Sequence, residues 1–291
     1  MNTILFLDGS MVSKFLLQNL LKNKEFNIKK IILSPEFKEL YRLNFTKNIP
    51  IIKTDFKNDL KKIKLGTYDI AFSYYNFKIP KYVLKKIKIG GINFHPSYLP
   101  FNRGRHSTFW GIVKKTPLGA SSHWLSSNFD EGDIFYQKKL KGFEKNSAKI
   151  IYNQQLKLLK EVITKTIYLI SNKKFIKIKQ DSKHASYHRS NEIKKFITFN
   201  LDRKIDNFKF SRIIRATCFN KKTGFFIKDD KNKYLIYSKF TFKKYSKNKK
   251  YKFFLIKKFR NLFDKKKINF VIYLNKSKML INSIAYVDDY D

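Results

Sequence analysis

Asn93 and His95 lie two residues apart in the stretch GINFHPSYLP, and both are polar in an otherwise apolar run. Residues i and i+2 of a strand project to the same side, so we expect the two side chains to point together. Pro96 cannot continue the hydrogen-bond ladder, which ends the strand directly after His95. An imidazole can take a proton near neutral pH, and a carboxamide N–H can stabilise a developing oxyanion. The pair therefore suits attack on a carbonyl carbon.

A carboxylate that could orient the imidazole follows in the stretch SSNFDEGDIFY. Asp130 lies there in a glycine-containing loop between two expected strands. An Asn, a His and an Asp brought to one place would form a proton-transfer and oxyanion site without a metal. Taken alone, each signal also has a structural interpretation. An Asn-x-His pair on a strand is more often a satisfied structural pair, and Asp-Glu-Gly-Asp is more often a turn.

Short apolar runs alternate with helical patterns through the first 170 residues, which predicts a mostly parallel sheet with helices on both faces. The expected strands are 3–7, 30–33, 49–52, 68–73, 91–95, 119–125 and 132–136. The expected helices lie around 15–20 and over 36–43, 81–88, 108–114 and 147–170. In such α/β sheets ligands bind beyond the carboxyl ends of the strands, and Asn93 and His95 lie at one such end.

The pattern changes beyond about residue 200. A helix is expected over 205–216, and strand-like runs follow at 225–227, 234–237, 251–256, 270–274 and 279–286. We therefore predict two domains. Residues 1–180 form a Rossmann-like α/β domain, and residues 181–291 form a smaller β-rich C-terminal domain.

Composition limits the class of protein. A chain of 291 residues with 43% hydrophobic side chains is long and apolar enough for a real core. Its single cysteine, Cys218, excludes an internal disulfide and cysteine-based metal sites. No apolar run is long enough for a transmembrane helix, and the N-terminus lacks the basic start of a signal peptide, so we expect a cytoplasmic protein. No histidine spacing predicts a metal site, and His123 is interpreted as structural.

The net charge of +41 suggests nucleic acid or an anionic membrane as a partner. Only eight of the 63 basic residues are arginines, the residue that recognises phosphates and base edges best. We therefore favour a lysine-rich background composition over a dedicated nucleic-acid surface. The segment 239–267 keeps the alternative open, because lysines interleaved with aromatic residues can bind nucleic acid. A solvated sheet face gives the same pattern.

The segment GINFHPSYLPFNRGRHSTFWGI, followed by PLGASSHWLSSNFDEGDIFYQKKL, resembles the folate-dependent formyltransferase family. That family has an Asn-x-His-Pro-Ser-x-Leu-Pro strand and turn, an Arg-Gly pair soon after it, and a later Asp-x-Gly-Asp loop. On this resemblance Asn93, His95 and Asp130 fall on the catalytic triad. The Phe109-Trp110 pair is similar to the sugar N-formyltransferases, whereas methionyl-tRNA formyltransferases usually show Arg-Gly-x-x-Pro.

The resemblance implies N10-formyltetrahydrofolate as the formyl donor and a nucleotide-linked amino sugar as the acceptor, in the synthesis of surface polysaccharide or lipopolysaccharide. It also implies a homodimer, whereas the expectation that no metal is bound comes from the histidine spacing. The residues expected to hold the donor are Tyr75, Phe77, Ile79, Ser126, Ser127 and Asp130. The residues expected to meet the acceptor are Tyr98, Arg103, Gly104 and Arg105. The aromatic residues are equally well explained as core or rim, and an exposed turn arginine is usually only solvated.

Three other functions stay open. A methionyl-tRNA formyltransferase acting on charged initiator tRNA is favoured by the basic C-terminal region and opposed by the stretch RGRHSTFW. A formyltetrahydrofolate hydrolase would share the triad and use water as the acceptor. A basic RNA-binding protein without catalysis is opposed by the intact Asn93, His95 and Asp130.

Overall fold

The computed structural model describes most of the first 196 residues and short segments beyond them. The described residues are 1–34, 48–54, 66–144, 146–196, 198–200, 212–213, 215–217, 219, 224–228, 233–237, 242–244, 270–274, 277–281 and 283–286. The chain divides into two compact units. The first contains Met1–Ser107, Thr116–Gly142 and Tyr152–His188, and the second contains Thr108–Lys115, Phe143–Ile151 and Arg189–Asp291. The division expected after residue 180 stays a prediction.

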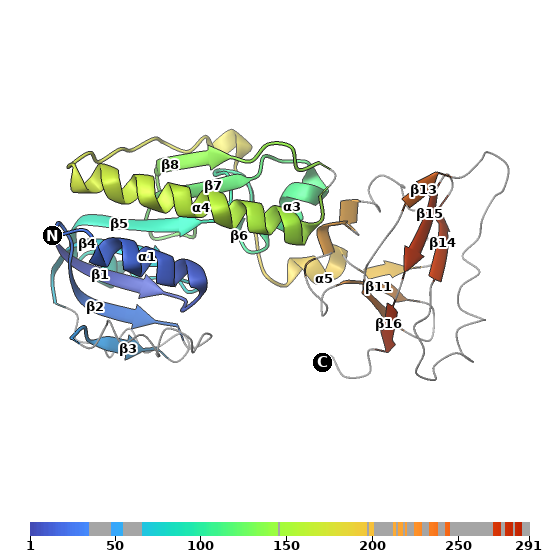
Figure 1. The fold of residues 1–291 in the computed structure, drawn as a ribbon, viewed down its shortest axis with the longest axis horizontal. Coiled ribbons are helices and arrows are strands. Elements are labelled where there is room, and N and C mark those ends of the chain that lie inside the picture. The colour runs from blue at the N-terminus through green and yellow to red at the C-terminus, as the bar shows by residue number, and fades with distance from the viewer. Residues whose placement is uncertain are drawn as a thin grey trace. The chain divides into compact units, whose positions relative to one another are not determined.

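A seven-stranded sheet in the order β3-β2-β1-β4-β5-β7-β8 is the base of the first unit (Figure 1). Its strands are β1 (Asn2–Leu7), β2 (Asn27–Leu33), β3 (Ile51–Lys53), β4 (Tyr68–Tyr74), β5 (Ile87–His95), β7 (Gly119–Trp124) and β8 (Ile134–Lys139). The strands from β3 to β5 run parallel, and β7 and β8 are antiparallel to their neighbours. The predicted mostly parallel, Rossmann-like sheet is confirmed.

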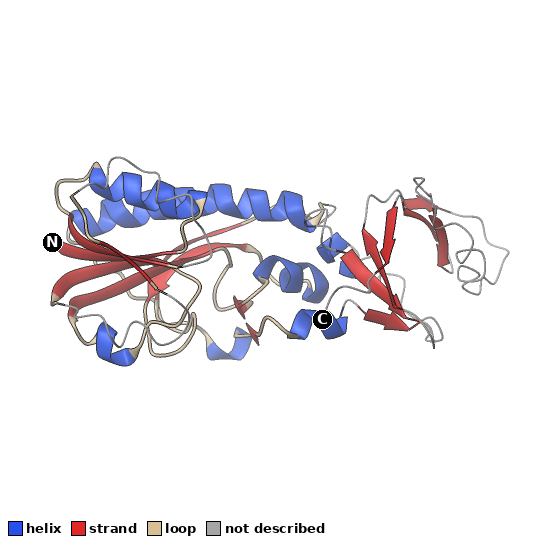
Figure 2. Cartoon of the chain, turned by 90° about the horizontal axis from the view of Figure 1, so that it is seen from below, coloured by secondary structure: helices blue, strands red, loops and turns tan. Residues whose placement is uncertain are grey.

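Helices cover both faces of this sheet, as the alternating pattern predicted (Figure 2). The helices concerned are α1 (Met11–Leu21), α2 (Lys81–Leu84) and α4 (Ala148–Ser171). On one face Leu16 of α1 and Val162 of α4 share a buried cluster with Phe72. On the other face Val83 of α2 packs with Phe6. Because the central strands are buried on both sides, they read as continuous apolar runs in the sequence.

The helix expected over 81–88 ends at Leu84, and β5 begins at Ile87 rather than at residue 91. The reason is the pair Gly90 and Gly91, which as a sequence signal indicates a break. Within the fold both glycines lie inside the strand. The Trp124 ring and the Leu125 side chain occupy the space that their side chains would need. Long-range packing therefore extends the strand where the local pattern ends it.

The second unit contains the buried ring of Trp110, which lies edge-on to Phe109 and to Phe196, with ring centroids 5.0 and 4.7 Å apart. Its two small sheets have the orders β10-β11-β12-β16 and β13-β15-β14. The remaining elements of the chain are β6 (Arg103–Gly104), α3 (Ser107–Lys114), η4 (Ser182–His184), β9 (Tyr187–His188), α5 (Glu192–Phe196), β10 (Thr198–Asn200), β11 (Gly224–Lys228), β12 (Lys233–Tyr237), β13 (Phe242–Lys244), β14 (Phe270–Leu274), β15 (Ser277–Ile281) and β16 (Ser283–Tyr286).

Most strands expected in the C-terminal part are present, with one difference. The run expected over 279–286 is divided between β15 and β16, because the two halves pair with different strands in different sheets. The helix expected over 36–43 and the strand expected over 251–256 lie outside the described residues. Of the helix expected over 205–216, the structure describes residues 212–213 and 215–217, which are helical.

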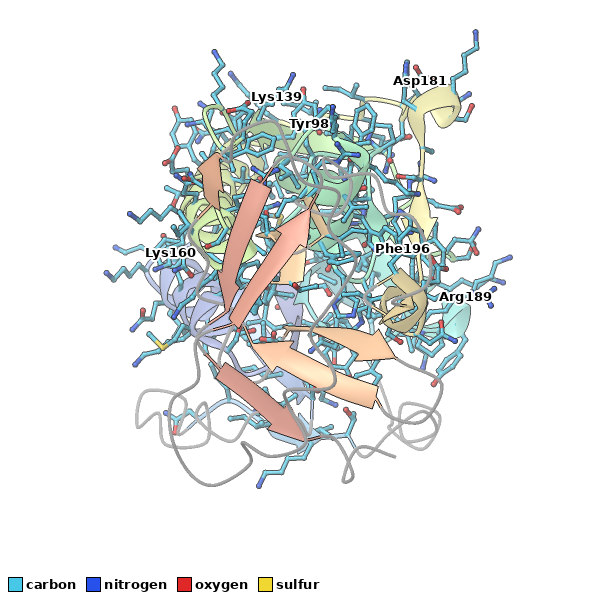
Figure 3. The ribbon with its side chains drawn as sticks, turned by 90° about the vertical axis from the view of Figure 1, so that its right-hand side faces the viewer. Tyr98, Lys139, Lys160, Asp181, Arg189 and Phe196 are labelled. Atoms are coloured by element: carbon cyan, nitrogen blue, oxygen red, sulfur yellow. The ribbon has the colours of Figure 1, made fainter. Side chains whose placement is uncertain are left out.

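The positive charge lies at the surface, where lysines such as Lys139 and Lys160 are exposed (Figure 3). With 63 basic and 22 acidic residues, most basic side chains cannot each have an acidic partner of their own. The molecule therefore attracts anionic ligands of any kind. Within the described ranges, no helix is long and apolar enough to cross a membrane.

The buried face of β5 provides a test of the core. Phe94 is 2% exposed and stacks on Phe72 with ring centroids 6.4 Å apart. We expect Phe94→Ala to lower the free energy of unfolding by about 3–5 kcal/mol, measured by urea denaturation. Ile89→Ala, at an exposed position of the same strand, is the matched control and is expected to cost less than about 1 kcal/mol. Equal losses would contradict the assigned faces of β5.

Candidate active site

Strand β5 positions the first two polar groups of the site. Alternation along the strand places Asn93 and His95 on the face opposite to the buried Phe94. The chain leaves the strand at Pro96, whose carbonyl accepts hydrogen bonds from Ser107 Oγ and Gln155 Nε2, both at 2.7 Å. This anchored exit fixes the end of β5 and therefore the backbone that carries His95.

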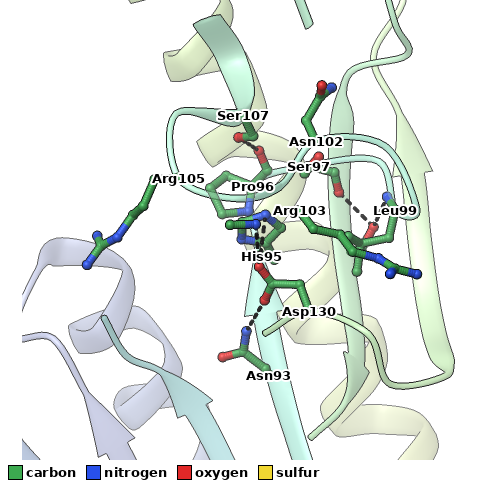
Figure 4. Close-up of polar contacts among 12 residues, drawn as sticks. Asn93, His95, Pro96, Ser97, Leu99, Asn102, Arg103, Arg105, Ser107 and Asp130 are labelled. Atoms are coloured by element: carbon green, nitrogen blue, oxygen red, sulfur yellow. Dashed lines mark hydrogen bonds and ion pairs between the residues drawn. The ribbon is translucent and has the colours of Figure 1, made fainter. Parts of the chain in front are cut away.

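Asp130 meets this pair from the loop between β7 and β8 (Figure 4). Its Oδ1 accepts a hydrogen bond from Asn93 Nδ2 at 3.4 Å, and its Oδ2 lies 3.6 Å from His95 Nε2. Oδ2 also accepts a hydrogen bond of 2.8 Å from the backbone N–H of Gly104. The structure thus brings together the three residues that the sequence analysis proposed as catalytic.

His123 is a fourth member of this cluster that the sequence analysis interpreted as structural. Strand β7 pairs antiparallel with β5, and the register places His123 opposite Asn93. Its Nδ1 lies 2.9 Å from the carbonyl oxygen of Trp124, which can only accept, so Nδ1 carries a proton. Its Nε2 lies 3.1 Å from Asn93 Nδ2 and 3.3 Å from Asp130 Oδ1. The sequence shows that a histidine is present at position 123, but not the strand register that brings it opposite Asn93.

The orientation of the Asn93 amide follows from these neighbours. Its Nδ2 faces the Asp130 carboxylate and the Nε2 of His123, both of which can accept a hydrogen bond. The opposite orientation would place the amide oxygen against a carboxylate oxygen, with no proton between them. Asn93 therefore presents donors toward the centre of the cluster.

Burial lowers the pKa of His95, because a charged imidazole would lose its hydration there. The nearby Asp130 carboxylate raises this pKa, but by less than burial lowers it. His95 Nε2 is buried and has no hydrogen-bond partner among the described residues. The hydrogen bond between His95 and the backbone of Asn102 is therefore made by the other ring nitrogen, Nδ1. At neutral pH His95 is therefore a neutral base with a free lone pair on Nε2.

Burial alone would raise the pKa of Asp130, which is 9% exposed. The positive charge of a protonated His95, the neighbouring His123 side chain and the N–H of Gly104 act in the opposite direction and together hold the pKa of Asp130 well below its usual range. Asp130 is therefore a carboxylate at all physiological pH values. Within the described part of the chain, no group of three or more His, Cys, Asp or Glu side chains is placed to hold a metal ion.

The aromatic residues expected to hold a formyl donor lie on the chain after β4. The hydroxyl of Tyr75 is 2.8 Å from Thr54 Oγ1, and its ring packs edge-on against Phe77 with centroids 5.5 Å apart. The side chain of Ile79 is 5% exposed and belongs to the buried cluster that contains Phe6. Its side chain is therefore core, and any contact of Ile79 with a ligand falls to its backbone. A donor-binding role for these residues stays a proposal.

The loop that carries Asp130 also contains the other two residues expected near the donor. Ser126 Oγ donates to the carbonyl of Asn128 at 3.0 Å, which is a turn within the loop. Ser127 is exposed. Both precede Asp130 by only a few residues in the same loop, and a donor-binding role for them stays a proposal.

Arg105 and Arg103, both expected to meet the acceptor, point to opposite sides of the site (Figure 4). Arg105 is exposed and donates to the side-chain oxygen and the carbonyl of Asn76, at 3.1 and 3.0 Å. Tyr98 is half-buried. Arg105 thus borders the chain that follows β4, where an anionic ligand could reach its charge.

Arg103 is engaged inside the protein. Its Nε and Nη2 donate to Gln180 Oε1 at 3.1 and 2.9 Å, and its Nη1 lies 3.8 Å from Glu131. Gln180 is not among the site residues expected from the sequence. No local signal marks it, because its partners lie 48 to 77 residues away along the chain. The neighbouring Gly104 has a φ of +84°, and a Cβ there would collide with the carbonyl oxygen of His188.

Residues 47–167 match the model of the formyl transferase family. The GDP-perosamine N-formyltransferase of Brucella melitensis is 36% identical over 101 residues, which cover 33% of this chain and 39% of that enzyme. The methionyl-tRNA formyltransferase of Alkaliphilus oremlandii is 28% identical over 149 residues, which cover 48% of this chain and 47% of that enzyme. The matched part spans less than half of each of these relatives.

A solved structure extends the likeness beyond the matched segment. The N-formyltransferase of Helicobacter canadensis, in complex with folinic acid and dTDP-3-aminofucose, superposes with a TM-score of 0.64. The superposition covers 97% of this chain and 99% of that chain, at 19% sequence identity. At this level of identity the comparison establishes a shared fold.

Titration of His95 tests the charges of the cluster directly. We expect the midpoint of its imidazole, followed by NMR, to lie below that of a free histidine, because burial disfavours the charged ring. Asp130→Asn removes the negative charge that raises the pKa, so the midpoint is expected to fall further. The chain has only five histidines, which permits assignment by single substitutions. An unchanged or higher midpoint in the variant would contradict the assigned contact.

Proposed function

We propose that this chain, which carries a formyl transferase domain over residues 47–167, transfers a formyl group from N10-formyltetrahydrofolate to the primary amine of a nucleotide-linked amino sugar. The resemblance seen in the sequence is thus confirmed at the level of the family. The observation that carries the proposal is the cluster of Asn93, His95 and Asp130, in which a neutral imidazole with a free Nε2 lies beside a buried carboxylate. The product would serve surface polysaccharide synthesis.

In the first step His95 acts as the base. A bond forms between the acceptor nitrogen and the formyl carbon, and negative charge develops on the formyl oxygen. Nε2 of His95 takes the proton that the amine must lose, which its lowered pKa permits at neutral pH. The Asn93 amide has two N–H groups. In this proposal one is shared between His123 and Asp130, and the other donates to the developing oxyanion.

In the second step the charges of the cluster support the departure of the folate. Once protonated, His95 is an imidazolium with its Nε2 3.6 Å from the Asp130 carboxylate, which stabilises the ion that burial disfavours. The bond between the formyl carbon and N10 breaks, and His95 returns its proton to that nitrogen. His95 and Asp130 end in their starting states, and tetrahydrofolate and the formamide are the products.

The choice of an amino sugar over tRNA rests on two observations. The perosamine enzyme is the more identical of the two curated relatives, at 36% against 28%, and the Helicobacter canadensis structure is a complex with dTDP-3-aminofucose. Methionyl-tRNA formyltransferase remains the second candidate, because the Alkaliphilus oremlandii enzyme matches a longer segment and the chain has a net charge of +41. A cytoplasmic location and a homodimer stay predictions.

Substitutions in the triad test the mechanism. We expect Asn93→Ala to lower kcat by about 10²–10³-fold, because the oxyanion loses a positioned donor. Asp130→Asn is expected to lower kcat by at least about 10²-fold, because the imidazolium loses its carboxylate. Both variants should keep the circular dichroism spectrum of the native protein. The matched controls are Asn19→Ala in α1 and Asp69→Asn in β4, both near the opposite end of the sheet. Turnover near the native value in either triad variant would refute the assignment.

The acceptor is identified by release of tetrahydrofolate from N10-formyltetrahydrofolate. The assay compares dTDP-, UDP- and GDP-linked amino sugars with charged initiator tRNA and with buffer alone. We expect release that requires one of the amino sugars. Release only with tRNA would support the second candidate and assign the lysine-rich surface to tRNA binding, with strong salt dependence. Release at full rate in buffer alone would indicate a hydrolase.

A further inference from the structure

Gln180 is a buried polar side chain that the mechanism above does not use. It is 8% exposed and follows α4, far from both sequence motifs. Its Nε2 donates to the carbonyl oxygens of Asp130 and Gly132, at 2.9 and 2.6 Å. Its Oε1 accepts from Nε and Nη2 of Arg103. The amide thus makes four hydrogen bonds, which is its full capacity.

Two of these bonds hold the backbone that carries the catalytic carboxylate. Asp130 has a φ of +55°, a left-handed conformation that is unfavourable for a residue with a Cβ. Such a conformation persists only where surrounding contacts enforce it. Gly132 is equally constrained, because a Cβ at this position would collide with the carbonyl oxygen of Trp124. The two bonds from Gln180 therefore hold the carbonyl groups of both constrained residues.

The other two bonds hold the partner of that carboxylate. Arg103 is followed by Gly104, whose N–H donates to Asp130 Oδ2 at 2.8 Å. The guanidinium of Arg103 is fixed by its two bonds to Gln180, and its backbone N–H donates to the carbonyl of Ser186 at 2.8 Å. Gln180, Asp130, Gly104 and Arg103 consequently form a closed ring of contacts. Both ends of the bond between Gly104 and Asp130 depend on the same glutamine.

The segment 176–188, here called the strap, contacts the two strands that flank the Asp130 loop and also pairs with β6. Ile176 O accepts from the Trp124 ring N–H at 2.7 Å, and Ile178 forms a two-bond bridge with Ile134. Further along, β9 in the strap pairs with β6. Gln180 lies between the contacts with β7 and β8 and the pairing with β6. Its one side chain contacts both the Asp130 loop and Arg103.

We propose that Gln180 is a positioning residue for the reaction: through its contacts with the Asp130 loop and Arg103, it holds the Asp130 carboxylate against His95 and the Gly104 N–H. The inference rests on the proposed function, because positioning matters only if Asp130 and His95 act in catalysis. A geometric shift of about 1 Å in such a group can cost about 10²-fold in rate.

The first test measures the contact between Asp130 and His95 without any substrate. The midpoint of the His95 titration is measured by NMR in the native protein, in Asp130→Asn, in Gln180→Met and in the double variant. Met has a similar length and cannot form the four hydrogen bonds. We expect Asp130→Asn to shift the midpoint less in the Gln180→Met background than in the native background. An equal shift in both backgrounds would overturn the proposal.

The second test measures turnover. Gln180→Met is expected to lower kcat by about tenfold or more and to change KM by less than about threefold, since Gln180 acts through Asp130. In the Asp130→Asn background the same substitution should have little further effect. Ile163→Val, a core change in α4, is the control for lost stability, and Gln18→Met is the control for the chemical change at an exposed position. Additive losses in both backgrounds would indicate a merely structural role and refute the proposal.

A further variant covers the case in which Gln180→Met does not fold. Gln180→Glu keeps an acceptor for Arg103 and loses both donors to the loop, so it is expected to give the same two results. The NMR test and the turnover test also distinguish failure of the Gln180 proposal from failure of the proposed function. If no acceptor releases tetrahydrofolate with the native protein, the proposed function fails and the NMR measurement alone decides the role of Gln180.

Discussion

A carboxylate buried in the first unit is the constraint on which the site depends. Removing an ionised carboxylate from water costs several kcal/mol unless charges and donors surround it. Asp130 is surrounded by two imidazoles, an asparagine amide and a backbone N–H. These four groups come from three segments: His95 and Asn93 from β5, His123 from β7 and the Gly104 N–H from β6. The requirement to keep Asp130 ionised therefore determines how these strands and their connecting loops meet.

The same carboxylate gives His95 its dual behaviour. Burial keeps the imidazole neutral at rest, and in the proposed reaction the carboxylate stabilises the imidazolium that forms once a proton has been taken. A more exposed histidine would be a stronger base, but it would already carry a proton in a larger fraction of the resting molecules. A buried histidine without Asp130 could accept a proton only at greater cost. In the proposed reaction these two opposing effects allow His95 to accept a proton at neutral pH.

The two arginines near the site have different surroundings, one inside the protein and one at its surface. The guanidinium of Arg103 is bound by Gln180 and lies near Glu131, whereas Arg105 is exposed beside Asn76. Of the two, Arg105 is the more available to an anionic acceptor, and the excess of lysines adds an attractive field around it. The Phe109-Trp110 pair, which the sequence analysis used to separate family branches, is buried in the second unit. The Phe109-Trp110 pair therefore distinguishes the family branches through packing and not through contact with a ligand.

The sequence by itself determined the local geometry of the site and the class of fold. Alternation put Asn93 and His95 on one face, Pro96 ended their strand, and the alternating apolar runs specified an α/β sheet. These features depend on neighbours in the chain, where residue type and period suffice. Only the tertiary structure decided that β5 extends back through Gly90 and Gly91, that His123 stands opposite Asn93, and that Gln180 joins two loops. Strand register and long-range hydrogen bonds depend on contacts between distant segments, and a single sequence contains no local signal for them.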